Sequence, residues 1–235
     1  MAVTVSRVLP MLYLASQSPR RRQLLCQLGV RFKVLRLEDV EAEPELPGDG
    51  PAGGVVPSAR LRRHRRSSAV PASGRPTPRQ FAVRLAERKA RSVEHRVERG
   101  IILGVDTIVV VGRRILGKPE DPADARRMLK LLSGRTHQVI SGICLLERPS
   151  GRCRLASEVS RVRFRRLAPQ EIESYVATRE PYDKAGAYAI QGQAGFFVER
   201  IEGDYFNIVG LPVARLLKLL EKSGIVRPSG ARRMS

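Results

Sequence analysis

Between Ile101 and Val111 the chain is almost entirely apolar and largely β-branched, and the pair Asp106-Thr107 interrupts this run. Runs of this composition favour a buried strand. A buried carboxylate is costly unless it is ion-paired, bound to a metal or neutralised. We therefore expect a strand with Asp106 at its centre or end, and we expect this side chain to line a cleft. The alternative is that Asp106 caps a local turn.

Helix and strand patterns alternate along the rest of the chain. Ser18-Pro19 and Thr77-Pro78 each place a capping residue before a proline, which is typical of the first turn of a helix. The patterns predict strands at 11–15, 32–37, 101–111, 115–116, 138–146 and 154–164, and a hairpin at 202–204. They predict helices at 18–28, from 77 onward, and at 121–134, 169–178 and 212–220. Elements in this order favour an α/β fold whose central mixed sheet is flanked by helices.

The formal net charge of +20 would favour nucleic acid, an anionic membrane or a polyanionic substrate as a partner. Residues 42–77, rich in Arg, Pro, Gly and Ser, and the short basic stretch 223–235 have the composition of segments that build no core. We therefore expect one domain over 8–222, a disordered insertion at 42–77 and a flexible tail at 223–235. Aromatic residues make up only 5% of the chain, which disfavours a base-stacking module. The insertion could still bind nucleic acid weakly and without specificity.

The usage of cysteine and histidine favours the cytoplasm and disfavours zinc. The three cysteines contain no CxxC pair and leave an odd thiol, so no disulfide framework is predicted. The three histidines share no ligand spacing. The apolar stretch at 8–15 lacks a cleavage pattern, and no apolar run approaches the roughly 18 residues of a membrane helix. We expect a cytoplasmic protein without membrane attachment.

The segment 16–22, Ser-Gln-Ser-Pro-Arg-Arg-Arg, is the first candidate for ligand binding. A strand that leads into a capped helix presents free backbone N–H groups and a positive dipole end, and arginine suits phosphate oxygens. The segment could equally be a surface turn with solvated arginines. In the glycine-punctuated loop at 180–192, Gln191 could read the edge of a base or simply hydrogen-bond within the loop. Taken alone, Lys89 and Lys118 are typical of solvated surface lysines.

Several segments, in order, resemble the Maf family of nucleotide pyrophosphatases. They are LASQSPRR at 14–21, RLAERKA at 84–90, GVDT at 104–107, GKP at 117–119, LSG at 132–134, the loop at 180–192, and IEGDY at 201–205 with VGLP at 209–212. The resemblance implies the fold of inosine-triphosphate pyrophosphatases, with a cleft between two lobes. It also implies hydrolysis of the bond between the α- and β-phosphates of a nucleoside triphosphate with a divalent cation, Mg²⁺ or Mn²⁺. It leaves a homodimer open.

The same resemblance implies roles for individual residues. Asp106 takes the position of the proton acceptor. The positions that tune substrate choice are Arg20, Thr107 and Gln191. Charged active-site positions match Glu41, Lys89 and Lys118, with Asp106 and Glu41 as the expected metal ligands. Phosphate binding is expected of Ser16, Ser18, Arg20, Arg21 and Lys184. The insertion at 42–77 is longer than the connection that the family uses there, and it could displace Glu41.

The sequence Asp-Lys-Ala-Gly at 183–186 and Gln-Gly at 191–192 resembles the branch of the family that acts on dTTP and UTP. A pyrophosphatase for these pyrimidine nucleotides is therefore the expected function. One alternative is a pyrophosphatase for other non-standard nucleotides, such as 7-methyl-GTP. The other is a basic regulatory module that binds nucleic acid.

Overall fold

The computed structural model describes residues 10–37 and 76–225 of the chain. Its strands are β1 (Leu12–Ala15), β2 (Phe32–Leu35), β3 (Gly100–Val111), β4 (Arg114–Leu116), β5 (Thr136–Arg148), β6 (Cys153–Phe164) and β7 (Val198–Glu202). Its helices are α1 (Pro19–Gln27), α2 (Pro78–Arg91), α3 (Pro122–Leu132), α4 (Pro169–Val176), α5 (Tyr205–Val209) and α6 (Val213–Lys222). Short 3-10 helices lie at Glu94–Arg96, Pro181–Asp183, Ala185–Ala187 and Gln193–Phe197.

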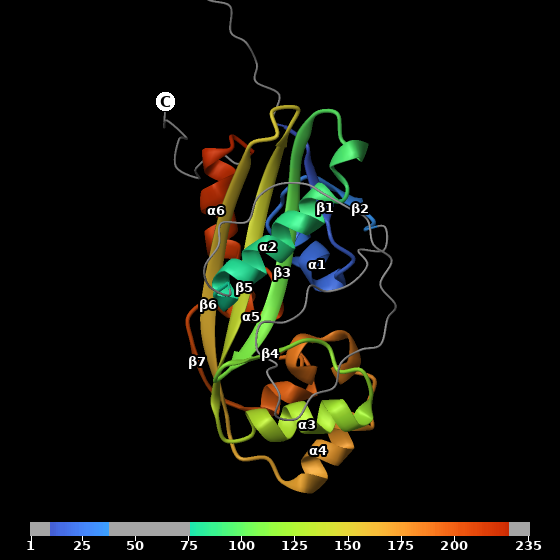
Figure 1. Cartoon of the computed structure of the whole chain (residues 1–235), viewed down its shortest axis with the longest axis vertical. Helices are drawn as coiled ribbons and strands as arrows, with labels where there is room; N and C mark the ends of the chain where they lie inside the picture. The colour runs from blue at the N-terminus through green and yellow to red at the C-terminus, as the bar shows by residue number, and fades with distance from the viewer. Residues whose placement is uncertain (1–9, 38–75, 226–235) are drawn as a thin grey trace, which may run out of the picture.

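The strands form one seven-stranded mixed sheet in an elongated molecule (Figure 1). The sheet has the order β2-β1-β3-β5-β6-β7, and β4 pairs with β3 beside this path. β2, β1 and β3 are parallel, whereas β3, β5, β6 and β7 pair antiparallel. The predicted α/β fold with a central mixed sheet is confirmed. Glu41, all but the last two residues of the predicted insertion, and most of the predicted tail lie outside the described residues.

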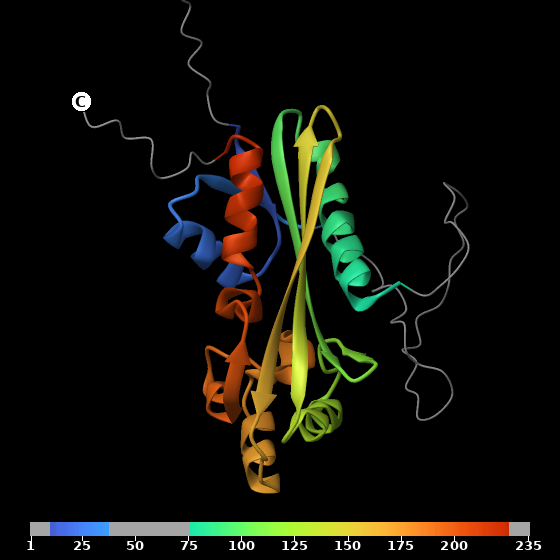
Figure 2. The ribbon, with the colours of Figure 1, turned by 90° about the vertical axis from the view of Figure 1, so that its left-hand side faces the viewer.

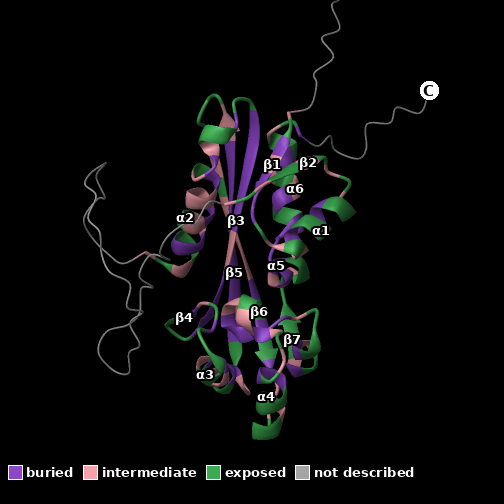
Figure 3. Cartoon of the chain, turned by 90° about the vertical axis from the view of Figure 1, so that its right-hand side faces the viewer, coloured by how far each residue is buried: buried purple, intermediate pink, exposed green. Residues whose placement is uncertain are grey.

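Alternate residues of β3 pack against different helices. Leu103 and Val105 share a core with side chains of α1 and α6, whereas Ile102 packs with α2. Figure 2 shows α2 on one side of the sheet and α1 and α6 on the other. Farther along the strand, Val109 and Val111 join a separate core with α3 and α4. The long central strands therefore run through both halves of the molecule, and much of their length is buried (Figure 3).

One edge of β3 is paired only near its two ends. β1 pairs with residues 101–104 and β4 pairs with residues 109–111. The structure shows no strand pairing on this edge for residues 105–108, as far as the described residues go, whereas the other edge pairs with β5 from Gly100 to Val110. We call residues 105–108 the edge gap. Asp106 and Thr107 lie in it, and because they are neighbours in a strand they point to opposite faces of the sheet.

Two glycines let α2 lie directly on the sheet. A Cβ atom on Gly104 of β3 would lie 2.0 Å from the carbonyl oxygen of Ala86, and a Cβ atom on Gly142 of β5 would lie 2.2 Å from that of Ala82. Both distances are shorter than any Cβ contact can be. Ala82 and Ala86 are themselves fully buried. The backbone of α2 therefore contacts β3 and β5 without a layer of larger side chains between them.

The start of α2 agrees with the prediction. The hydroxyl of Thr77 accepts a hydrogen bond from the backbone N–H of Gln80, and the side chain of Gln80 accepts one from the backbone N–H of Thr77. These reciprocal bonds satisfy donors that a helix terminus leaves open. Pro78 occupies the first turn, where its missing N–H costs nothing.

The predicted hairpin at 202–204 is wrong. β7 pairs back onto β6, and the chain then enters α5 instead of a further strand. The side chain of Asp204 accepts hydrogen bonds from the backbone N–H groups of Phe206 and Asn207, so it caps this helix. Gly203 adopts a φ of 105° that permits the turn. A glycine followed by Asp thus marks a passage from strand to helix here.

No helix in the described residues is long and apolar enough to span a bilayer.

The close contact of α2 with the sheet predicts that Gly104→Ala is strongly destabilising. The added methyl group would overlap the backbone of Ala86, so we expect a loss of about 3 kcal/mol or more in the free energy of unfolding. Gly29→Ala is the matched control, because Gly29 has a φ of 65° but no atom within 4 Å of an added Cβ. Its cost should be limited to about 1 kcal/mol of backbone strain. Urea unfolding of both variants measures the difference, and equal losses would contradict the packing described here.

Candidate active site

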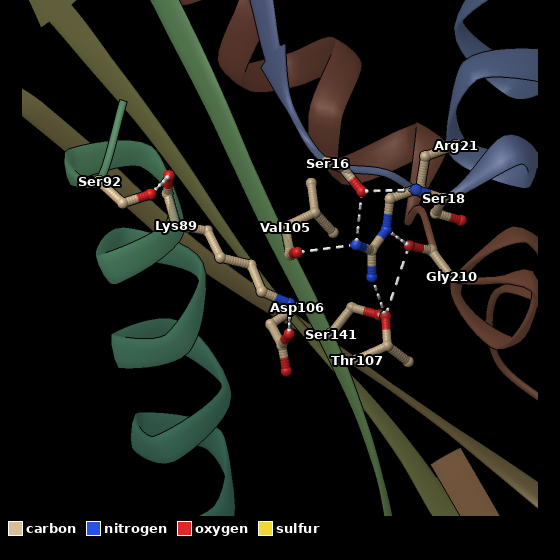
Figure 4. Close-up of polar contacts among 10 residues, drawn as sticks. All are labelled: Ser16, Ser18, Arg21, Lys89, Ser92, Val105, Asp106, Thr107, Ser141 and Gly210. Carbon is tan, nitrogen blue, oxygen red and sulfur yellow. Dashed lines mark hydrogen bonds and ion pairs between the residues drawn. The ribbon is translucent and has the colours of Figure 1, made fainter. Parts of the chain in front are cut away.

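Asp106 points from the edge gap toward α2, where its carboxylate forms an ion pair with the ammonium group of Lys89 (Figure 4). The exposed fractions of these side chains are 13% for Asp106 and 26% for Lys89, so the pair is sheltered but still open to a ligand. Lys89 lies one residue before Ala90, a fully buried residue on the face of α2 that packs on the sheet. The contact of α2 with the sheet therefore brings the two charges together.

On the other face of β3, Arg21 of α1 forms hydrogen bonds with the edge gap and with residues next to it (Figure 4). Its guanidinium group donates hydrogen bonds to the carbonyl oxygens of Val105, at 2.9 Å, and Gly210, at 2.8 Å. It also donates to the hydroxyl groups of Ser16 and Thr107, each at 3.1 Å. Arg21 is only 8% exposed. Its donors are thus largely engaged inside the protein, where they hold the edge of β3 and orient Thr107.

The hydroxyl of Thr107 lies between two side chains. It accepts from Arg21 and lies 2.8 Å from the hydroxyl of Ser141 on β5. Burial lowers the pKa of the Arg21 guanidinium, and the negative charge of Asp106 opposes this shift.

The first turn of α1 begins beside this cluster. The hydroxyl of Ser16 accepts hydrogen bonds from Arg21 and from the backbone N–H of Ser18, at 3.2 Å. Ser18 is the N-cap residue of α1, but its own side chain makes no capping hydrogen bond. The N–H groups of the first turn therefore keep their capacity to bind an anion.

A small pocket lies next to α1, between α5 and the loop that contains Tyr188 and Gln191. Its lining includes Arg20, Tyr188, Gln191 and Ile208, so it combines a cation, an amide and apolar surface. Arg20 lies 3.8 Å from the carboxylate of Asp183, which also forms an ion pair with Lys184. The pocket is small, with a volume of about 20 Å³, and it brings apolar surface, an amide and a cation together.

Comparison with known proteins agrees with this arrangement. The family model described as Maf-like protein matches residues 11–223. The chain belongs to the Maf family. Among its relatives in that family, a protein of Carboxydothermus hydrogenoformans named dTTP/UTP pyrophosphatase is 40% identical over 213 residues, which cover 91% of this chain and 98% of the relative. Proteins with the same name are 42% identical in Anaeromyxobacter dehalogenans, over 93% and 97% of the two chains, and 43% identical in Syntrophotalea carbinolica, over 91% and 85%.

This Maf-family structure brings most of the predicted site residues into two groups. Around the edge gap lie Asp106 with Lys89, and Arg21 with Ser16 and Thr107. Around the pocket lie Arg20 and Gln191, and Lys184 joins them through Asp183. The two groups meet at the start of α1, because Arg20 and Arg21 are adjacent in the chain.

Two predicted residues, Lys118 and Ser18, have a weaker structural connection to these groups. Lys118 is exposed after β4, next to Gly117, whose carbonyl oxygen accepts from the N–H of Gly186 at 2.9 Å. Ser18 contributes a backbone N–H to the cluster. Glu41 lies outside the described residues. Within those residues, no group of three or more His, Cys, Asp and Glu side chains forms a metal site.

Two residues near the site were not singled out by the sequence analysis. Ser141 is fully buried against Thr107, and its signal in the sequence is a polar residue inside the apolar strand at 138–146. Asp183 bridges Arg20 and Lys184, but in the sequence it is one of several charges in a loop. The carbonyl of Gly210 could not be found from the sequence at all, because any residue carries this group.

One wall of the pocket rests on a buried histidine. The imidazole Nε2 of His137 lies 2.9 Å from the hydroxyl of Tyr188, and the rings of both residues make edge contacts with Phe164. Burial lowers the pKa of His137 to about 4. The folded protein therefore holds this imidazole neutral at pH values where an unfolded chain protonates it.

This pKa shift predicts a specific loss of stability in acid. The unfolded chain binds a proton on His137 near pH 6.5 and the folded chain only near pH 4, so lowering the pH through that window favours unfolding. The contribution should reach about 3 kcal/mol by pH 4. His137→Phe keeps an aromatic ring against Phe164 but removes the titrating group. Unfolding free energies of both proteins at pH 7 and pH 4.5 test this, and an equal drop in the two would refute the assignment.

Proposed function

We propose that this protein is a nucleoside-triphosphate pyrophosphatase that hydrolyses dTTP and UTP to the monophosphate and pyrophosphate. Relatives that are 40% to 43% identical bear the name dTTP/UTP pyrophosphatase, which supports this choice of substrate. The structural observation that carries the proposal is the Asp106–Lys89 ion pair in the edge gap. The carboxylate is sheltered, and it lies one residue before Thr107, whose hydroxyl Arg21 of α1 contacts on the other face of β3.

In the proposed reaction Asp106 accepts a proton from the attacking water. The water oxygen forms a bond to the α-phosphorus, the bond from this phosphorus to the bridging oxygen breaks, and pyrophosphate leaves. A positioned carboxylate suits the role of general base. The ion pair with Lys89 orients the Asp106 carboxylate, and the backbone of β3 fixes the position of Asp106.

The triphosphate requires cationic and N–H donors around this carboxylate. We assign phosphate contacts to Arg20, Lys184 and Lys118, and to Ser16 and Ser18 at the uncapped first turn of α1. Arg21 is proposed to act mainly through the hydrogen bonds that hold Thr107 and the edge of β3.

The chemistry of the site also fits a divalent cation, Mg²⁺ or Mn²⁺. Mg²⁺ is commonly bound by one or two carboxylates together with phosphate oxygens of the substrate. Asp106 supplies one such carboxylate, and Glu41 is the second proposed ligand. The cation would neutralise charge on the phosphate oxygens.

Base recognition is assigned to the pocket. Gln191 presents one donor and one acceptor, which match the paired groups on the edge of a pyrimidine. Arg20 and Thr107 are proposed to assist this selection from the α1 side and from the edge gap. A cytoplasmic location and a homodimer stay predictions.

The decisive test is turnover of Asp106→Asn against dTTP, UTP, 7-methyl-GTP and ATP with Mg²⁺ or Mn²⁺, with monophosphate and pyrophosphate quantified. The amide keeps the shape of the side chain but cannot accept the proton, so we expect turnover to fall by about 10²-fold or more. Asp121→Asn is the matched control. Asp121 caps α3 and has no assigned role in the site, and asparagine caps a helix equally well.

We expect the wild-type protein to prefer dTTP and UTP and to release pyrophosphate. Release of inorganic phosphate and a diphosphate would contradict cleavage between the α- and β-phosphates. Preference for 7-methyl-GTP would favour the other family branch. Near-normal turnover by Asp106→Asn would remove Asp106 from the mechanism.

A further inference from the structure

Gln191 lies in a tight turn whose backbone is held by hydrogen bonds. The N–H of Gly192 donates to the carbonyl oxygen of Ala189 at 3.1 Å, which closes the turn around Gln191. The side chain of Gln191 is exposed and lines the pocket. A side chain on such a turn can discriminate between ligands only if the turn itself is held in one position.

Two side chains hold this turn on either side of Gln191. The N–H of Ala189, two residues before it, donates to the hydroxyl of Tyr175 at 3.3 Å. The N–H of Gln193, two residues after it, donates to the carboxylate of Glu180 at 3.2 Å. The hydroxyl of Tyr175 in turn donates to the other oxygen of Glu180 at 2.9 Å. Tyr175 and Glu180 therefore form one connected brace under the turn.

The brace is itself fixed in the protein. Tyr175 lies on α4, is 2% exposed, and packs its ring edge-on against Phe197 with 5.2 Å between ring centroids. Burial and the nearby charge of Glu180 raise the pKa of the Tyr175 hydroxyl, so it remains a donor. The fit is close, because a Cβ atom on Gly192 would lie 2.2 Å from a carboxylate oxygen of Glu180.

We propose that Tyr175 and Glu180 are positioning residues that set base selectivity by holding Gln191 against the pocket. Neither residue is among the lining residues of the pocket, so each acts through the turn. This inference rests on the proposed function, because it assumes that the pocket receives the base of a nucleoside triphosphate. Asp106 and the first turn of α1 lie on other elements. Lys184 donates to the backbone carbonyl oxygen of Glu180, which a change of either side chain keeps, so the brace should affect base recognition much more than bond cleavage.

The test compares Tyr175→Phe and Glu180→Gln with the wild-type protein. Tyr175→Phe keeps the ring packing but removes both hydrogen bonds of the hydroxyl. Glu180→Gln keeps the shape of the side chain but has only one acceptor oxygen, so it cannot accept from Tyr175 on one oxygen and from Gln193 on the other. Tyr182→Phe is the matched control. The Tyr182 hydroxyl donates to the carbonyl oxygen of Val176 at 2.8 Å, in the same region but away from the turn.

The measured quantities are KM and kcat for UTP, dTTP, CTP and ATP. We expect the ratio of kcat/KM for UTP to that for ATP to fall roughly tenfold in Tyr175→Phe and Glu180→Gln, mainly through KM for UTP. Turnover at saturating UTP should stay within about threefold of the wild type, because chemistry at the edge gap is unchanged. Tyr182→Phe should keep the wild-type ratio.

Each other outcome is informative. An unchanged ratio, an equal loss for all four nucleotides, or the same shift in Tyr182→Phe overturns the inference. If Tyr175→Phe does not fold, as judged by thermal melting, the ratio in Glu180→Gln decides. A wild-type protein that hydrolyses none of the four nucleotides contradicts the proposed function itself, whereas a selective wild type with unaltered variants contradicts only the role of the brace.

Discussion

The contact between α2 and the glycines of the central strands determines the geometry of the candidate active site. A layer of side chains normally separates packed elements, so that helix axes or stacked sheets lie about 10 Å apart. At Gly104 and Gly142 this layer is absent, and the helix backbone rests on the sheet. Lys89, three residues after Ala86, can then reach Asp106, two residues after Gly104. The ion pair is thus a consequence of backbone packing, and it depends on residues that carry no functional group.

The edge gap is the second constraint, and it explains why the site lies where it does. A strand edge without a partner leaves backbone groups that need hydrogen bonds. Arg21 supplies one to the carbonyl of Val105 and uses its remaining donors to tie the gap to Ser16, Thr107 and Gly210. The carbonyl group of Val105 therefore has a partner although no strand pairs with it on this edge. The gap lies in the middle of a long central strand, between the two halves of the molecule.

Local patterns in the sequence predict the local features of this protein well. A few neighbouring residues suffice to predict the strand around Asp106, from its apolar run, and the start of α2, from Thr77-Pro78. Other features depend on residues far apart in the chain. The partner of Lys89 depends on how α2 packs against Gly142, some fifty residues later. The sequence alone therefore suggests a solvated lysine, whereas the structure shows Lys89 in an ion pair with Asp106. The sequence suggests that Arg21 binds phosphate or is solvated. Its observed partners, the carbonyl groups of Val105 and Gly210, cannot be predicted because every residue carries a carbonyl group.

The central claim is that the edge gap receives the triphosphate while the neighbouring pocket receives the base. A crystal structure with Mg²⁺ and dUTP whose α–β bridging oxygen is replaced by an imido group tests it most directly. The account predicts the α-phosphate beside Asp106, the phosphate chain along the start of α1, and the uracil edge against Gln191. A nucleotide bound in the reverse direction, with its base in the edge gap, or bound away from both Asp106 and Gln191, would contradict it.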